Sequence, residues 1–258
     1  MIPHLAADGT RLALHRRGQG APVFFQHGLG GDHLQTFESF PDLPGWQLNT
    51  LECRAHGASE STGPLSIAGF AADVAGAMPE GAVLGGISMG AAISARLAVL
   101  QPERLRALIL VRPAWFDSPA PANMASIAEV AAMIARGETA AEFAATPTHA
   151  RLAATAPDNL SSLNGFFARE PLALTARLLG AIAADGPGIT RAEIGAIRLP
   201  TLVCGCAEDE IHPLSLARDW AATIPGARFV DLPPKGRDKP AHLAALHAAI
   251  AQFLKEIR

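Results

Sequence analysis

Short apolar runs alternate along most of the chain with longer stretches in which apolar residues recur at helical spacing. A continuous apolar run bounded by turn residues is typical of a strand that is buried on both faces of a parallel sheet. An Asp8-Gly9 turn within residues 5–17 also predicts a hairpin near the N-terminus. The predicted buried strands are residues 22–26, 46–51, 82–87, 105–111, 199–205 and 227–232.

Helical periodicity occupies the stretches between these runs. Ser66 is a candidate N-cap for a helix over residues 66–78. Residues 89–100 are apolar on most sides, which predicts a buried helix, and residues 241–257 carry apolar side chains on one face. Strands that alternate with helices predict an α/β fold with a mostly parallel sheet, right-handed crossovers and helices on both faces.

Residues 113–192 break the alternation because they contain no convincing strand. Helical pieces are expected at residues 126–136, 140–145 and 171–184, separated by turns that contain proline and glycine. A helical insertion between two strands predicts a cap over one edge of the sheet. The core would then consist of residues 1–112 and 193–258.

The composition is that of a folded globular domain, with 258 residues, 49% apolar and 17% charged. The formal charge of −3 leaves no basic excess for phosphates, which argues against a nucleic-acid partner. No apolar run approaches the ~18 residues of a membrane span, and the N-terminus lacks the apolar run of a signal peptide. Three cysteines, Cys53, Cys204 and Cys206, do not make a disulfide framework. We therefore expect a cytoplasmic monomer or homodimer that acts on a small molecule.

The pentapeptide Gly86-Ile87-Ser88-Met89-Gly90 carries the strongest chemical signal. It lies between a predicted buried strand and a predicted buried helix, where a G-x-S-x-G motif forms a tight turn that exposes the serine hydroxyl. The glycines are needed because bulky residues two positions either side would clash. The motif predicts a nucleophile at Ser88, with a plain turn serine as the alternative.

A glycine-rich segment, residues 27–31 (His-Gly-Leu-Gly-Gly), follows the strand predicted at 22–26. Its glycines let a backbone N–H point into a site, and we expect the Leu29 N–H to form an oxyanion hole with the Met89 N–H. The alternative is a loop that only turns the chain. The spacing matches neither a P-loop nor a dinucleotide fingerprint. His27 is expected to tie the loop together by hydrogen bonds.

With these motifs the chain resembles the α/β-hydrolase superfamily, of the capped esterase and lactonase type, over nearly its whole length. Residues 54–59 resemble a further loop of that family, with Ala55 in place of a glycine and Glu52 in place of the usual aspartate. The resemblance implies the α/β-hydrolase fold and a triad in the order serine, acid, histidine. It implies no cofactor.

The resemblance also indicates where the triad acid and histidine lie. After the strand at 199–205, Asp209 and Pro213 match the family pattern D-x-x-x-P, with Glu208 and Asp117 as weaker candidates for the acid. The histidine is expected after the last strand, where His242 and His247 are found.

The last loop, where the triad histidine is expected, departs from the family pattern. The Gly-His pair that the family usually shows in this last loop is absent. His242 fits best because it lies near the start of a helix and close to the sheet edge, whereas His247 is expected in the core. His212 is expected at the rim of the site. No histidine or cysteine spacing matches a metal site, so no metal is predicted.

Two residues are candidates for substrate binding. Arg112 ends a strand at the carboxyl edge of the sheet, where it is placed to pair with a substrate carboxylate. Trp115 is a candidate for an acyl pocket, although aromatic residues in this pattern are more often core. The predicted activity is hydrolysis of a small to medium carboxylic ester or lactone through an acyl-enzyme on Ser88. Alternatives are carbon–carbon bond hydrolysis or perhydrolysis on the same triad, and a non-catalytic ligand-binding protein with the same fold.

Overall fold

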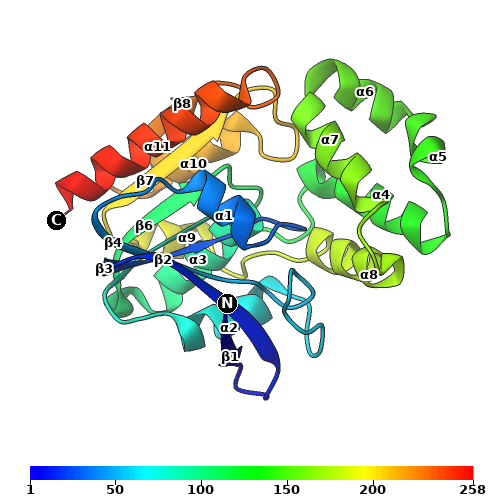
Figure 1. Ribbon diagram of the computed structural model, residues 1–258. Coiled ribbons are helices and arrows are strands. Elements are labelled where there is room, and N and C mark those ends of the chain that lie inside the picture. Colours follow the sequence, from blue (N-terminus) through cyan, green and yellow to red (C-terminus); the bar gives the residue numbers. More distant parts are fainter. Residues whose placement is uncertain (258) are drawn as a thin grey trace.

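An eight-stranded sheet forms the centre of the molecule, for which a computed structural model describes residues 1–257 (Figure 1). The strands lie in the order β1-β2-β4-β3-β5-β6-β7-β8. The first two strands pair antiparallel, the second is antiparallel to the fourth, and all other pairs are parallel. The mostly parallel α/β sheet predicted from the sequence is thus confirmed. The strands are β1 (Ile2–Leu5), β2 (Arg11–Gly18), β3 (Gly20–Gln26), β4 (Gly45–Leu51), β5 (Ala82–Ile87), β6 (Leu105–Val111), β7 (Thr201–Cys206) and β8 (Arg228–Leu232).

Helices cover both faces of this sheet (Figure 1). One face is covered by α1 (His33–Ser39) and α11 (Lys239–Glu256), which contact each other. The other face is covered by α2 (Ile67–Ala77), α3 (Met89–Leu100), α9 (Arg191–Ala196) and α10 (Leu214–Thr223). The sequence pattern did not predict α1, α9 or α10, because short helices give too few turns for a clear periodicity.

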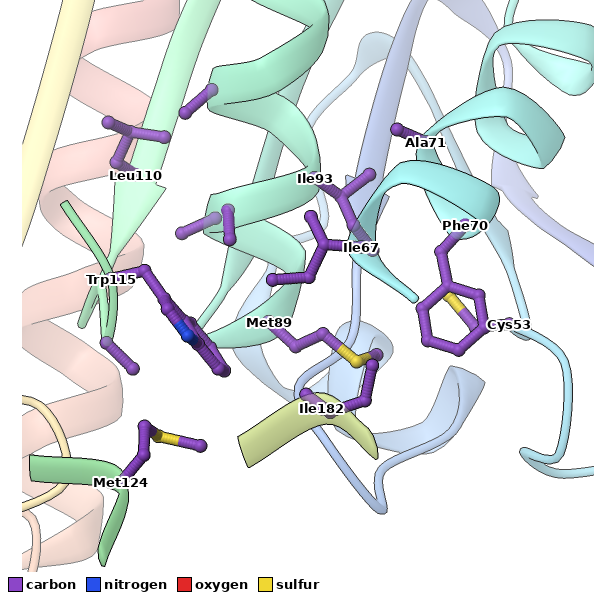
Figure 2. Packing of buried hydrophobic residues seen from close by; sticks show 14 of the residues in the cluster. Cys53, Ile67, Phe70, Ala71, Met89, Ile93, Leu110, Trp115, Met124 and Ile182 are labelled. Carbon is purple, nitrogen blue, oxygen red and sulfur yellow. The ribbon is translucent and has the colours of Figure 1, made fainter. Parts of the chain in front are cut away.

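The central strands divide their side chains between two cores, because successive residues of a strand point to opposite faces. In β5, Val83 packs under α11 while Leu84 packs under α2 and α3. In β6, Ile109 likewise belongs to the core under α11, and Leu110 belongs to the core under α2 and α3. Figure 2 shows the core under α2 and α3, where Leu110 and Ile93 lie among other buried apolar side chains. A strand buried on both faces reads as a continuous apolar run, which is why these strands were predictable.

Residues 113–192 are helical and contain no strand, as expected for an insertion. The helical elements between residues 122 and 183 form a lobe beside the sheet, drawn in green to yellow-green in Figure 1. Two of its helices, α6 and α7, each begin with a proline at the first helical position, where the N–H that proline lacks would have no acceptor within the helix. The elements of the lobe are a 3₁₀ turn (Ala122–Met124) and α4 (Ala125–Ala135), α5 (Ala140–Ala144), α6 (Pro147–Thr155), α7 (Pro157–Phe166) and α8 (Leu172–Ala183).

The three cysteines are buried and carry free thiols. Burial raises the pKa of Cys204 to about 12 and that of Cys206 to about 11. Thiols this hard to ionise behave as small core residues rather than as nucleophiles. Among the described residues, no helix is both long enough and apolar enough to cross a membrane.

Candidate active site

Ser88 sits on a strained turn between β5 and α3. Its backbone has φ 56° and ψ −112°, in the positive-φ region that side chains rarely adopt. A Cβ on Gly86 would lie 2.5 Å from the carbonyl carbon of Gly90, and a Cβ on Gly90 would lie 2.4 Å from the Gln26 oxygen. Only glycine fits at either position. The local geometry is therefore that of the turn expected for a nucleophilic serine.

The glycine-rich loop after β3 lies against this turn. A Cβ on Gly28 would come within 3.4 Å of the Ser88 Cβ, so the loop and the serine are immediate neighbours. Leu29 lines the same pocket as Ser88, and among the described residues its N–H makes no hydrogen bond. Met89 is the first residue of α3, so its N–H has no acceptor within the helix. Two backbone donors thus flank the serine.

Gln35 and two buried histidines hold the glycine-rich loop in place. The Gly28 N–H donates to Gln35 Oε1 at 2.7 Å, and the Gly30 N–H donates to His56 Nε2 at 3.0 Å. His27 contacts the Gly28 carbonyl through Nδ1 at 2.8 Å. Burial lowers the pKa of both histidines, that of His56 well below its ordinary value. His27 therefore has the structural role expected from the sequence.

Asp209 follows β7 and is the most highly connected carboxylate of the site. Its Oδ1 accepts from the His212 ring Nδ1 at 2.8 Å and from Asn159 Nδ2 at 2.9 Å. Its Oδ2 accepts from Arg112 Nε at 2.6 Å. Burial alone would raise the pKa of Asp209, but the charges and hydrogen bonds of His212 and Arg112 hold it well below its usual range. The carboxylate is therefore ionised.

His212 has one ring nitrogen bound and the other free. Since an ionised carboxylate can only accept, the Nδ1 that faces Asp209 carries the proton. The opposite nitrogen, Nε2, is buried and has no hydrogen-bond partner among the described residues. His212 and Ser88 line the same pocket, although they are not hydrogen-bonded to each other. Asp209 thus holds Nδ1, and Nε2 is left without a protein partner.

His242, the histidine expected to complete the triad, has other partners. Its Nδ1 lies 2.8 Å from the Pro233 carbonyl oxygen. Burial lowers its pKa. Among the described residues, the expected hydrogen bond between Asp209 and His242 is not formed, and His242 borders a second hollow that Ser88 does not line. The reason is local, because α11 begins at Lys239 and encloses His242 in its first turn.

The remaining triad candidates also point elsewhere. His247 contacts the Glu38 carbonyl oxygen through Nε2 at 2.8 Å. Glu208 forms an ion pair with Arg237. Asp117 accepts a hydrogen bond from the neighbouring Ser118 hydroxyl. Asp209 is therefore the acid that the structure pairs with a histidine, and that histidine is His212.

The pocket in front of Ser88 contains about 560 Å³ of empty space, counting the part that is open to solvent. The inserted lobe supplies much of its wall. Its apolar lining consists of Leu29, Ile87, Met124, Ile127, Phe166 and Ile211, and its polar lining includes Gln35, Ser88, Arg112, Asp158, Asn159, Ser162, His212 and Lys235.

The two residues expected to bind substrate do not have free functional groups. Arg112 pairs with Asp209 and, through Nη2 at 2.8 Å, with Asp158, so two carboxylates of the protein already hold its guanidinium. Trp115 is buried among the apolar side chains of the core (Figure 2) and donates its indole N–H to the Asp185 carbonyl at 2.9 Å. It is not among the residues that line the pocket. A side chain that large and apolar is more stable in the core.

Asp158, Asn159 and Lys235 are among the polar residues of the site that were not predicted. Asn159, in α7, donates to Asp209 and accepts from the backbone N–H groups of Glu210 and Ile211 at 2.8 and 3.1 Å. Asp158 bridges Arg112 and Lys235. None of them stands in a motif, so the sequence carries no signal for them. They connect the inserted lobe to the loops of the core.

Residues 21–238 match the model of a protein family described as "alpha/beta hydrolase fold". The chain is a member of this family. Among solved structures of the fold, a thermophilic esterase from Thermogutta terrifontis superposes with a TM-score of 0.74, covering 99% of this chain and 98% of that one at 24% identity. Similarity at that level of identity establishes the shared fold alone.

Two curated relatives of this alpha/beta hydrolase differ in how much of their length it covers. RutD of Klebsiella pneumoniae, a candidate carbamate hydrolase, is 29% identical over 83% of this chain and 84% of its own length. The dihydrolipoyllysine-residue acetyltransferase component of the acetoin cleaving system of Cupriavidus necator is 36% identical over 118 residues, 42% of this chain. The match spans only 31% of that longer protein.

Proposed function

We propose that this alpha/beta hydrolase cleaves a carboxylic ester or lactone through an acyl-enzyme on Ser88, with His212 as general base and Asp209 as its partner. The observation that carries the proposal is the buried, unpartnered Nε2 of His212 in the same pocket as Ser88. A buried polar atom without a partner costs stability, and such atoms occur where function requires them.

The reaction follows from the positions of these groups. His212 Nε2 takes the proton of the Ser88 hydroxyl as its oxygen forms a bond to the substrate carbonyl carbon. The Leu29 and Met89 N–H groups donate to the oxyanion. As the tetrahedral intermediate collapses, the bond to the alcohol oxygen breaks and His212 returns its proton to that leaving group. Water then attacks the acyl-enzyme by the same steps and frees Ser88.

The ionised Asp209 has two roles in this scheme. It accepts the Nδ1–H of His212 at 2.8 Å, which fixes the tautomer that leaves Nε2 basic. It also stabilises the imidazolium that forms when His212 is protonated. Ser88 and His212 are not hydrogen-bonded to each other, and catalytic hydrogen bonds often tighten only in the substrate complex.

Support for an ester or lactone comes from the acyl-transfer geometry, and the likeness to a thermophilic esterase agrees with it. The likeness to RutD makes a carbamate a reasonable second substrate class, because the serine would attack its carbonyl in the same way. The apolar lining from Met124, Ile127 and Phe166 favours a substrate with an apolar acyl or alcohol part.

A serine-reactive fluorophosphonate and intact-mass spectrometry test the proposal. We expect one adduct on the wild-type protein and none on Ser88→Ala. Ser162→Ala is the matched control, because Ser162 lines the same pocket, and it should label like the wild type. Absence of an adduct on folded wild-type protein would contradict the proposal and favour a non-catalytic ligand-binding protein. Hydrolysis of p-nitrophenyl acetate and butyrate, measured in parallel, reports the preferred acyl size.

A further inference from the structure

A second cluster of chemically active side chains lies away from the Ser88 pocket. It consists of His15 from β2, His33 at the start of α1, and Glu52, which directly follows β4. One ligand atom from each of the three lies within 4.8 Å of the other two. The residues are far apart in the sequence, so only the fold assembles them, and no spacing motif could have shown the cluster.

Both rings of the cluster face the same carboxylate oxygen. His33 Nδ1 lies 2.6 Å from Glu52 Oε1, and His15 Nε2 lies 3.4 Å from that oxygen. The second oxygen of Glu52 accepts the Ala58 N–H at 2.6 Å, which fixes the carboxylate. The two histidine rings are stacked, with their centroids 3.7 Å apart. Two nitrogens and one oxygen therefore converge on a small volume.

One ring nitrogen of this cluster makes no hydrogen bond. His15 Nε2 is buried and makes no hydrogen bond among the described residues, despite its nearness to Glu52. A ring nitrogen that makes no hydrogen bond is available to bind a metal ion. The Glu52 side chain is 2% exposed, whereas that of His33 is 27% exposed. The cluster is thus buried at its carboxylate end and open to solvent at His33.

We propose that His15, His33 and Glu52 form a binding site for a divalent transition-metal ion of the Zn²⁺ type. Two neutral imidazoles and a carboxylate are ligands that Zn²⁺ prefers, and a water molecule would complete a tetrahedral set. Bond lengths of about 2 Å place neighbouring tetrahedral ligands about 3.3 Å apart, so the 3.4 Å contact already fits.

Binding requires a small rearrangement on the exposed side. The 2.6 Å contact between His33 Nδ1 and Glu52 must open. The ion then binds Nδ1 of His33, and the proton of Nδ1 moves to Nε2 of the same ring. The stacked rings must also turn so that both lone pairs point at the ion. The partial exposure of His33 leaves room for that rotation. This inference concerns a site apart from Ser88 and does not depend on the proposed hydrolase activity.

Calorimetric titration of the metal-free full chain with ZnCl₂ tests the site. We expect one ion per chain, with affinity reduced at least ~10-fold in His15→Ala and in His33→Ala, since even a partner of a ligand has an effect of that size. His149→Ala is the matched control, because His149 is a partly exposed histidine in the inserted lobe, and it should bind like the wild type.

Co²⁺ provides a second readout that does not depend on activity. A Co²⁺-loaded wild type should show visible absorption bands of tetrahedral coordination, and these should be absent in His33→Ala. If His15→Ala does not fold, His33→Ala alone decides, because His33 is the more exposed ligand. Absence of stoichiometric binding in the wild type would overturn the proposal, as would binding that His33→Ala leaves unchanged.

Discussion

His212 donates its Nδ1–H to Asp209 Oδ1 at 2.8 Å, three positions along the same loop. The backbone N–H of His212 donates to the same oxygen at 3.0 Å, so one short turn presents the histidine to its acid. In the order expected from the family, the acid and the histidine would come from different loops. The loop after β8 instead brings Lys235 toward the pocket, where it pairs with Asp158. The hydrogen-bonded pair of Asp209 and His212 is thus assembled within one loop.

Asn159 should be needed to hold this loop. Its side chain is buried and bonds Asp209 and two backbone N–H groups, so Asn159→Ala leaves buried polar groups without partners. We expect the free energy of unfolding to fall by about 1–3 kcal/mol. Ser162→Ala, on the same helix, removes only a bond to its own turn and should change it by less than about 0.5 kcal/mol. Urea denaturation of the two variants compares them, and equal losses would contradict the role of Asn159.

Arg112 should stabilise the carboxylates of Asp158 and Asp209 rather than bind substrate. Arg112→Met leaves Asp158 and Asp209 with fewer positive partners, and breaking a buried ion pair in this way costs about 3–5 kcal/mol. We expect a loss of stability of that order in urea denaturation, with partial recovery in Arg112→Lys. A variant that is as stable as the wild type, with a raised KM only for esters that bear a carboxylate, would instead support the substrate role expected from the sequence.

The free energy of unfolding should decrease as the pH falls below about 6.5, the ordinary pKa of histidine. Burial holds the pKa of His56 and His27 below that value in the folded state, so the unfolded chain binds more protons in this range. Each such histidine contributes a slope of up to about 1.4 kcal/mol per pH unit, and the stability is recovered as the pH rises to 6.5. Urea denaturation at a series of pH values from 7.5 to 5.5 measures the slope. A free energy of unfolding that does not change over this pH range would contradict this account.

The glycine at the end of the G-x-S-x-G motif should be needed for folding. A Cβ on Gly90 would lie 2.4 Å from the Gln26 oxygen, and overpacking of this kind costs about 1–3 kcal/mol. Gly165 provides the contrast, because it is in a helix and a Cβ there meets nothing within 4 Å. Gly165→Ala should therefore raise stability by about 0.5–1 kcal/mol. Thermal denaturation of both variants is sufficient, and the opposite order of Tm would show that packing at Gly90 is not limiting.

The parts of the fold that were predictable are those set by local sequence. The buried strands are continuous apolar runs, and the turn at Ser88 follows from the two glycines that alone fit there. The helices of the lobe over residues 147–166 were not predicted, since polar and small residues leave them without a clear apolar face. Trp115 shows the limit for single residues, because its place in the core depends on the packing of distant segments.

The histidine that pairs with Asp209 could not be identified from the sequence for a related reason. The family order directs attention to the last loop, and His242 is the histidine found there. Whether the His242 ring reaches Asp209 depends on where α11 starts. Whether a nearer ring reaches it depends on which residue stands three positions after Asp209 in the turn. His212 stands at that position and contacts Asp209. This contact depends on how the loop folds, and no sequence motif indicates it.

The rate at which Ser88 is acylated by p-nitrophenyl acetate, in His212→Asn and in His242→Asn, tests the central claim most directly. Asparagine keeps a donor near the position of Nδ1, so each variant retains its contact with Asp209 or with Pro233 but lacks Nε2. Circular dichroism and thermal melts establish that both are folded. We predict that His212→Asn slows acylation by about 10²–10⁴-fold, while His242→Asn stays within a few-fold of the wild type. Slow acylation in His242→Asn beside a nearly unchanged rate in His212→Asn would contradict the account and make His242 the base.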